Sequence, residues 1–213
     1  MFYDLLHLIN EIGRLHQQFS KDFFVKCEAY NLKQSRVDNV IFAETYDEKF
    51  ISLVEEYIEN ISEWVIYLVF ESENPLLDTR FRVKNRGSSL NKLTYYRHGK
   101  VNPSIPLQKC MNDLLGFRII IAQDFDYREL LNQIQISERL ETSLFRPYVR
   151  TDEEYQGIHI YFKNDNNKYF PWELQIWKKS DADLNEKAHR THKEKRKYMS
   201  WAEMYEGSKH REE

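Results

Sequence analysis

The sequence predicts an α+β fold, because helical and strand-like patterns of apolar residues follow one another along the 213-residue chain. Two segments within the first 70 residues carry apolar side chains at spacings of three and four, which is the helical period. From residue 80 onward, short segments alternate with the period of two that strands show. The C-terminal part returns to a helical composition, rich in Lys, Arg, Glu and Ala.

The N-terminal part is expected to hold two helices. Residues 3–24 and 47–70 each place apolar side chains along one stripe, and the polar segment 31–39 between them is predicted to be a loop. Asn74-Pro75 marks the end of the second helix, because the residue before a proline disfavours helical backbone angles.

Strand-like segments follow the second helix. They cover residues 80–84, 117–122, 157–162 and 170–177. A short helix is predicted over 127–136, and a C-terminal helix from Asp181 towards Gly207. We therefore expect a helical region, 1–75, packed on a core of residues 76–213 within one compact unit.

Composition excludes several classes of protein. The net charge of −3 argues against a general binder of polyanions. Cys27 and Cys110 are too few and too far apart for a disulfide framework or a zinc site, which favours a reducing, cytoplasmic location. The longest apolar stretch, residues 64–70, is too short for a membrane helix, and the glycines form neither a Rossmann nor a P-loop motif.

Basic residues are concentrated in two segments. Residues 80–100 contain seven Lys and Arg and no acid, and residues 178–197 contain eight with four acids. On a strand, Arg80, Arg82 and Lys84 would share one face, where their charges repel one another unless an anion binds. Phosphate is the common anion at such clusters, so the first segment predicts a phosphate site.

Two acidic residues lie next to apolar strands. Glu173 shares a strand face with Gln175, and burying its carboxylate without a partner is costly, so a metal ion or a basic residue from segment 80–84 is expected beside it. Asp113 precedes the most apolar strand, where an Asp is also a common turn residue. Together the two carboxylates are candidate ligands of Mg²⁺, and one of them is a candidate proton acceptor.

Aromatic and imidazole side chains give weaker indications. Tyr155 is expected to be exposed in the loop before a strand, which makes it a candidate for base stacking, with His159 further along that strand. His189 and His192 are three residues apart on the predicted C-terminal helix, but no third metal ligand accompanies them. His16 is expected to be a packing or surface residue.

Five motifs occur in a fixed order between residues 82 and 192. They are Arg82-x-Lys84-x-x-x-Ser88-x-x-x-Lys92, Asp113-Leu114-Leu115-Gly116-Phe117-Arg118, Tyr155-Gln156-Gly157-Ile158-His159, Glu173-Leu174-Gln175-Ile176, and the pair Asn185 and His192. Together they resemble the synthetase domain of the RelA/SpoT family, the alarmone synthetases. The resemblance implies a mixed β-sheet related to that of nucleotidyltransferases, flanked by helices.

The resemblance also implies a role for each motif. Asp113 and Glu173 would be the catalytic acids that bind Mg²⁺. The residues expected to bind ATP are Arg82, Lys84, Ser88, Lys92 and Arg118. The residues expected to bind the acceptor are Tyr155, His159, Gln175, Asn185 and His192. Two alternatives stay open: Ser88 could cap the following helix, and Arg118 could be a structural partner of Asp113 or Glu173.

In the implied reaction, a ribose 3′-hydroxyl attacks the β-phosphorus of ATP, pyrophosphate is transferred and AMP leaves. Such chemistry depends mainly on positioning and on neutralising charge. The chain has no His-Asp pair, so the metal-dependent hydrolase domain of long family members is expected to be missing.

Several departures from the family pattern bear on the acceptor. Gln156-Gly157 stands where the family loop has Arg-Ser, Trp177 stands where it has Arg, and the stretch from Glu173 to Asn185 is a few residues longer than in housekeeping small synthetases. These departures are similar to those of toxic small alarmone synthetases, which implies the 3′-terminal adenosine of tRNA as acceptor and a protein antitoxin as partner. The basic C-terminal helix suits contact with an RNA backbone. The alternatives are GDP or GTP as acceptor, as in the stringent response, and an inactive nucleotide- or RNA-binding module.

Overall fold

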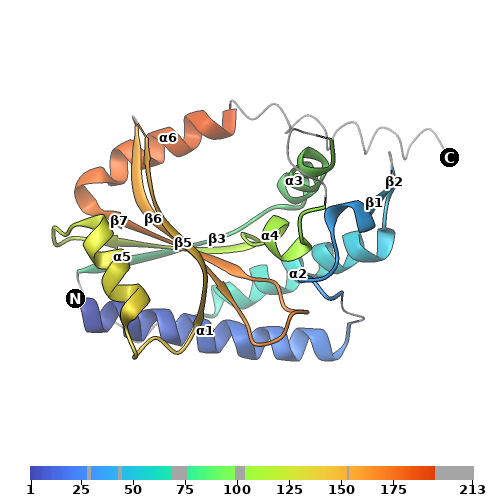
Figure 1. The fold of residues 1–213 in the computed structure, drawn as a ribbon, viewed down its shortest axis with the longest axis horizontal. Coiled ribbons are helices and arrows are strands. Elements are labelled where there is room, and N and C mark those ends of the chain that lie inside the picture. Colours follow the sequence, from blue (N-terminus) through green and yellow to red (C-terminus); the bar gives the residue numbers. More distant parts are fainter. Residues whose placement is uncertain (28–29, 43–44, 69–75, 99–103, 153, 195–213) are drawn as a thin grey trace.

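Five strands form the central sheet in the part of the chain that the computed structural model describes, which comprises residues 1–27, 30–42, 45–68, 76–98, 104–152 and 154–194. In chain order the strands are β3 (Leu77–Val83), β4 (Leu115–Ile121), β5 (Ser143–Asp152), β6 (Tyr155–Lys163) and β7 (Trp172–Lys178). Their order in the sheet is β3-β4-β7-β6-β5 (Figure 1). β4 and β7 are parallel and the other neighbours are antiparallel, so the expected mixed sheet and the α+β class are confirmed.

Two long helices lie on one side of this sheet, α1 (Phe2–Val25) and α2 (Glu48–Ile66) (Figure 1). The carboxylate of Asp47 caps α2 by accepting hydrogen bonds from the backbone N–H groups of Lys49 and Phe50. The first predicted helix is confirmed. The second ends at Ile66 rather than at residue 70, because Ile66 and Tyr67 are exposed and would bury no further surface by continuing the stripe.

The main hydrophobic core lies between these helices and the sheet. The sheet contributes alternate residues of its three central strands, Leu115, Phe117, Ile119, Ile121, Ile158, Ile160, Phe162, Trp172, Leu174 and Ile176. Buried apolar side chains of α1 and α2 complete this core. The apolar alternation along the strands therefore turns one face of the sheet towards α1 and α2 and leaves the other for polar groups.

Helix α6 (Ala182–Glu194) lies on the opposite side of the sheet from α1 and α2 (Figure 1). It follows β7 through a short 3-10 helix, Lys179–Asp181, and its Ala182 and Ala188 pack against a small apolar cluster. That cluster consists of Ile120, Tyr155 and Trp177. The predicted C-terminal helix is confirmed up to Glu194, and its continuation towards Gly207 lies outside the described residues.

Several elements were not predicted from the sequence. They are α3 (Arg86–His98), α4 (Leu107–Cys110), β5 and the two-residue strands β1 (Ile41–Phe42) and β2 (Thr45–Tyr46). Helix α3 has too few buried apolar residues to give a clear helical stripe. Its cap is Asn85, whose side-chain oxygen accepts from the Ser88 N–H, so the alternative of Ser88 as cap is wrong.

By contrast, α5 (Tyr127–Ile136) has the predicted bounds. Among the described residues, no helix is long and apolar enough to cross a membrane.

Candidate active site

Polar side chains from neighbouring strands line up in rows across the sheet face opposite α1 and α2. One row of cross-strand partners consists of Arg80, Arg118, Gln175, His159 and Tyr148. The next row consists of Arg82, Gly116, Glu173 and Tyr161. Because side chains of paired residues project from the same face, this register brings motifs far apart in the sequence together.

Two cavities open on this face. The first has a volume of about 290 Å³ and is lined by both candidate acids, Asp113 and Glu173, together with basic groups. The basic residues that line it are Arg82, Lys84, Lys92, Lys109, Arg146, Arg150 and His189. The second, of about 280 Å³, shares Arg82 and Glu173 with the first and is also lined by Arg118. The sequence-predicted acids and most of the predicted ATP contacts therefore lie around one continuous polar region.

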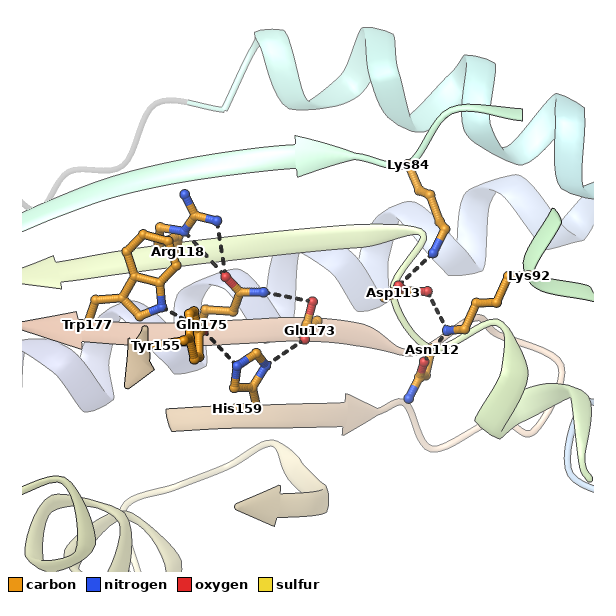
Figure 2. A network of polar contacts seen from close by, with 10 residues as sticks. All are labelled: Lys84, Lys92, Asn112, Asp113, Arg118, Tyr155, His159, Glu173, Gln175 and Trp177. Atoms are coloured by element: carbon orange, nitrogen blue, oxygen red, sulfur yellow. Dashed lines mark hydrogen bonds and ion pairs between the residues drawn. The ribbon is translucent and has the colours of Figure 1, made fainter. Parts of the chain in front are cut away.

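Asp113 is held between two lysines (Figure 2). Its Oδ2 lies 2.7 Å from the Lys84 Nζ, and its Oδ1 lies 2.8 Å from the Lys92 Nζ. The Lys92 ammonium also donates to the side-chain oxygen of Asn112 at 3.0 Å. Burial alone would raise the pKa of the Asp113 carboxyl, but Lys92 and Lys84 outweigh burial and hold that pKa well below its ordinary value.

The two lysines differ in their response to burial. Burial lowers the pKa of Lys84 to about 8, although Asp113 acts in the opposite direction. For Lys92, burial also acts downward, but the charge and hydrogen bond of Asp113 together with other neighbours raise the pKa overall. At neutral pH the Asp113 cluster therefore combines one carboxylate with two ammonium groups, and this cluster offers a net positive charge to an anionic ligand.

Glu173 is stabilised by neighbours other than the basic side chains predicted for it. Its Oε1 lies 3.0 Å from the His159 Nδ1, and its Oε2 accepts from the Gln175 amide at 3.3 Å. The expectation of an Arg or Lys partner from segment 80–84 is therefore wrong. Burial alone would raise the pKa of Glu173, but the hydrogen bond from His159 and nearby positive charge, that of Arg82 included, together lower it.

A chain of hydrogen bonds continues from His159 to Trp177 (Figure 2). The Trp177 indole N–H donates to the Tyr155 hydroxyl at 2.9 Å, and that hydroxyl lies 2.7 Å from the His159 Nε2. The Tyr155 oxygen accepts from the indole, which can only donate, and the Tyr155–His159 and His159–Glu173 hydrogen bonds complete the chain. The chain therefore fixes the His159 ring against the Glu173 carboxyl group.

Arg118 is fixed by three neighbours. Its guanidinium pairs with Glu186 on α6 at 2.7 Å and donates to the Gln175 side chain at 3.2 and 3.3 Å. It also lies 3.6 Å from the ring centroid of Trp177. The alternative of a structural pair between Arg118 and either predicted acid is wrong, and its contact with ATP stays a prediction.

Tyr155 is buried, so the prediction of an exposed tyrosine in a loop is wrong. It is the first residue of β6, and only 3% of its surface is exposed. Its ring contacts Trp177 and His189, and the guanidinium of Arg150 lies 4.8 Å from its centroid. The acceptor-stacking role that the resemblance implies stays a prediction, and in this structure the Tyr155 ring offers no open face.

Gly157 and Trp177, two of the departures from the family pattern, pack directly against each other. A Cβ at Gly157 would lie 2.8 Å from the Trp177 ring and 3.1 Å from the Tyr155 hydroxyl, which is closer than packed atoms allow. Trp177 is fully buried and held by its hydrogen bond to Tyr155. The large side chain at 177 therefore requires the absence of a side chain at 157.

The remaining predicted residues lie nearby with different partners. Asn185, on α6, uses its whole amide to bind the backbone N–H and C=O of Gln156 at 3.0 and 2.8 Å. Ser88 is half-buried on α3 and does not line either cavity. The backbone of His192 lies in α6, but its side chain lies outside the described part. Ligand contacts of these three residues stay predictions.

Sequence reasoning missed several residues that line the first cavity, among them Arg146 and Tyr148, and it considered His189 only as a possible metal ligand. The first two lie on β5, where Pro147 hid the alternation of Arg, Tyr and Arg at residues 146–150. Burial, followed by the charges of Arg118 and Arg82, lowers the pKa of His189 to about 3, so this imidazole is neutral at pH 7.

The magnesium ion that the resemblance implies stays a prediction, and both oxygens of Asp113 are paired with lysines in this structure. Both carboxylates line the same cavity, and the Asp113 charge acts on the pKa of Glu173, so the two groups interact electrostatically. Within the described residues, no group of three or more His, Cys, Asp or Glu could hold a metal. An ion held by Asp113 and Glu173 would therefore complete its shell with water and substrate phosphates, as Mg²⁺ often does.

Comparisons with known proteins agree with the motifs. A family model described as a region found in RelA / SpoT proteins matches residues 81–198, which is more than half of the chain. That range contains both acids, the lysine pair and the whole hydrogen-bond chain from Glu173 to Trp177. A search of curated proteins finds no match.

Three solved structures of one bacterial enzyme are similar to the chain. Small alarmone synthetase 1 from Bacillus subtilis is 18% identical over 75% of this chain and 90% of that one, with a TM-score of 0.39. Its complex with its product pppGpp gives 16% identity, coverages of 77% and 86%, and a TM-score of 0.40. Its complex with AMPCPP gives 15%, the same coverages, and 0.33. With scores this low, no residue's role is transferred from these structures.

Proposed function

The chain belongs to the RelA/SpoT family, and from this premise we propose that it is an ATP-dependent pyrophosphokinase whose acceptor is the 3′-terminal adenosine of tRNA. The observation that carries the proposal is the shared cavity of Asp113 and Glu173, with Lys84 and Lys92 beside it. Two acids of unlike surroundings next to a cationic wall suit a reaction between a polyanionic donor and a hydroxyl.

The donor end of the cavity is the lysine pair. In the proposed complex, the triphosphate of ATP binds the ammonium groups of Lys84 and Lys92 and the guanidinium of Arg82. Asp113 favours the protonated form of both lysines, because its charge acts to raise the pKa of each ammonium group. When Mg²⁺ is bound, it neutralises charge on the transferred phosphates, and Asp113 and Glu173 are its proposed protein ligands.

The acceptor end is Glu173. The 3′-hydroxyl gives its proton to the Glu173 carboxylate as its oxygen bonds to the β-phosphorus, and the bond from that phosphorus to the α-phosphate oxygen breaks to release AMP. A base must be unprotonated, and Glu173 with its lowered pKa is a carboxylate at neutral pH, although the same shift makes it a weaker base than an ordinary Glu. The hydrogen bond from His159 also fixes the rotamer of the carboxylate.

The choice of tRNA over a guanosine nucleotide rests on Gly157 and Trp177. The residue that the family pattern has as Arg is here a fully buried indole that packs beside α6, so residue 177 itself carries no charge and the nearest cation is the Arg118 guanidinium, 3.6 Å from the indole ring centroid. Lys187 and Arg190 on the same helix add basic groups for an RNA backbone. A toxic enzyme of this kind would be expected to have a protein antitoxin.

The test is incubation with ATP labelled at the γ-phosphate, together with tRNA or with GDP and GTP. We expect label on tRNA, and its loss when the 3′-terminal hydroxyl is oxidised beforehand. Label that appears only on guanosine nucleotides would show that GDP or GTP, and not tRNA, is the acceptor. Absence of transfer to either would contradict the proposal that the chain is a pyrophosphokinase. Glu59→Gln, an exposed residue of α2, is the matched control for acid substitutions and should not change transfer.

A further inference from the structure

Trp177 contacts the walls of both cavities from behind. It is fully buried and is not among the described residues that line either cavity. It lies on the same face of β7 as Glu173 and Gln175, because side chains two residues apart on a strand project from one face. A residue in this position can act on bound substrates only through the side chains that it touches.

The edge of the indole supports the acceptor side of the site (Figure 2). Its N–H donates to the Tyr155 hydroxyl at 2.9 Å. From there the hydrogen-bond chain continues through His159 to the Glu173 carboxyl group, and both of these residues line the first cavity. Because the ring is buried and its N–H has one direction, this bond fixes where the Tyr155 oxygen lies.

The face of the same indole supports Arg118. The guanidinium carbon lies 3.6 Å from the ring centroid, which is well within the range of a cation–π contact. Glu186 and Gln175 bind the N–H groups of this guanidinium, and Trp177 contacts its plane-forming carbon. Arg118 lines the second cavity and is the ATP contact that the family motif implies, so this side of the ring belongs to the donor.

We propose that Trp177 is a positioning residue for both substrates. Its edge orients the proposed base, Glu173, through the hydrogen-bond chain, and its face orients Arg118 for ATP. This inference rests on the proposed function, and it gives a role in that reaction to a residue that departs from the family pattern. The two properties of the ring can be removed separately, because phenylalanine keeps an aromatic face and has no N–H.

The first experiment compares Trp177→Phe with Trp177→Leu in transfer to tRNA and in binding of a non-hydrolysable ATP analogue. Trp177→Phe should lower kcat by about 2- to 10-fold, because one hydrogen bond is lost, and leave the Kd for the analogue within about twofold of the wild type. Trp177→Leu should lower kcat in the same way and also raise that Kd by about 3- to 30-fold, because the cation–π contact is lost. Trp64→Phe, on α2, is the control and should change neither constant.

The second experiment asks whether the two effects pass through Tyr155 and Arg118. Tyr155→Phe keeps the ring and removes only the hydroxyl, so it should lower kcat as Trp177→Phe does, and the double variant should lose no more. Arg118→Gln should weaken binding of the ATP analogue, and adding Trp177→Leu should weaken it no further. Independent, multiplying losses in either pair would overturn that half of the inference.

Damage to the fold alone would give another pattern. It would lower kcat of Trp177→Phe and Trp177→Leu in proportion to the folded fraction and leave the Kd of the folded molecules unchanged, which would overturn the inference. Far-UV circular dichroism and urea denaturation measure the folded fraction. If Trp177→Leu does not fold, Trp177→Met, whose flexible side chain fills more of the space without an aromatic face, takes its place.

Failure of the inference and of the proposed function give different results. Wild-type transfer to tRNA, with kcat and Kd unchanged in both Trp177 variants, would overturn the inference alone. Transfer only to GDP or GTP would overturn the tRNA acceptor, and the same variants, measured with GDP, would then decide the inference. A wild-type chain that neither transfers pyrophosphate nor binds the ATP analogue would overturn both.

Discussion

On the face towards α1 and α2 the sheet buries apolar side chains, and a buried histidine there, His16, is bound by Tyr57 and Asn164. On the face towards α6 lie charged groups, with Asp113 matched by two lysines and Glu173 by the side chains of His159 and Gln175. The stability of the apolar face depends on how much apolar area is buried, whereas that of the polar face depends on individual ion pairs and hydrogen bonds. Single substitutions on the two faces should therefore have very different consequences.

The largest effect on stability is expected at Asp113. Asp113→Ala would leave the ammonium groups of Lys84 and Lys92 close together without their shared anion, so we expect a loss of about 3–5 kcal/mol in the free energy of unfolding. Urea denaturation measures it. Adding Lys92→Met to this variant should recover part of the loss, and wild-type stability of Asp113→Ala would contradict the pairing.

On the apolar face, the largest loss of stability is expected at low pH, through His16. Burial lowers the pKa of His16 to about 3, against about 6.5 in the unfolded chain, so the unfolded state binds more protons between these values. Stability conferred by neutral His16 is complete above pH 6.5 and falls as the pH decreases, by on the order of 3 kcal/mol at pH 4.

The measurement is the free energy of unfolding between pH 7 and pH 4 for the wild type and His16→Gln. The wild type should lose more stability than the variant, with a difference of about one proton in the slope. His7→Gln, on the exposed side of α1, is the control and should follow the wild type. Parallel curves for the wild type and His16→Gln would contradict a neutral, buried His16.

A smaller effect is expected where Gly157 meets Trp177. Gly157→Ala should destabilise the fold by about 1–3 kcal/mol, because the new methyl group overlaps a fully buried indole. The same substitution in a Trp177→Leu background should cost much less, and a double-mutant cycle gives the coupling. Additive effects would show that Gly157 and Trp177 are independent departures from the family pattern.

The smallest effect on stability is expected at Glu173. Glu173→Gln keeps a side-chain oxygen to accept from His159 but loses the long hydrogen bond from Gln175, so a loss of about 1 kcal/mol is expected. Thermal unfolding beside Asp113→Asn provides the contrast between an acid paired with two lysines and an acid held by His159 and Gln175. Equal destabilisation of the two variants would remove the distinction.

The success of the sequence-based prediction also differs between the apolar and the polar face of the sheet. On the apolar face, spacing of Leu, Ile and Phe was enough for α1, α5 and most of β4, β6 and β7, because burial of one face imposes a period. Helix α3 and β5 were missed, since α3 buries few apolar residues and Pro147 interrupts β5.

On the polar face, the sequence predicted which residues gather but not how they pair. The motifs placed Asp113, Glu173 and Lys84 at one site, and all three line the same cavity. The partners of Glu173 and the burial of Tyr155 depend on cross-strand register and on how α6 packs, and neither follows from spacing along the chain.

The central claim is that Glu173 is the proton acceptor of pyrophosphate transfer in the cavity it shares with Asp113. The most direct measurement is single-turnover formation of AMP and pyrophosphorylated acceptor by Glu173→Gln, alongside binding of a non-hydrolysable ATP analogue and the Glu59→Gln control. We expect normal folding, ATP affinity close to that of the wild type and a transfer rate lower by about 10³-fold or more. Transfer at the wild-type rate by Glu173→Gln would contradict the account.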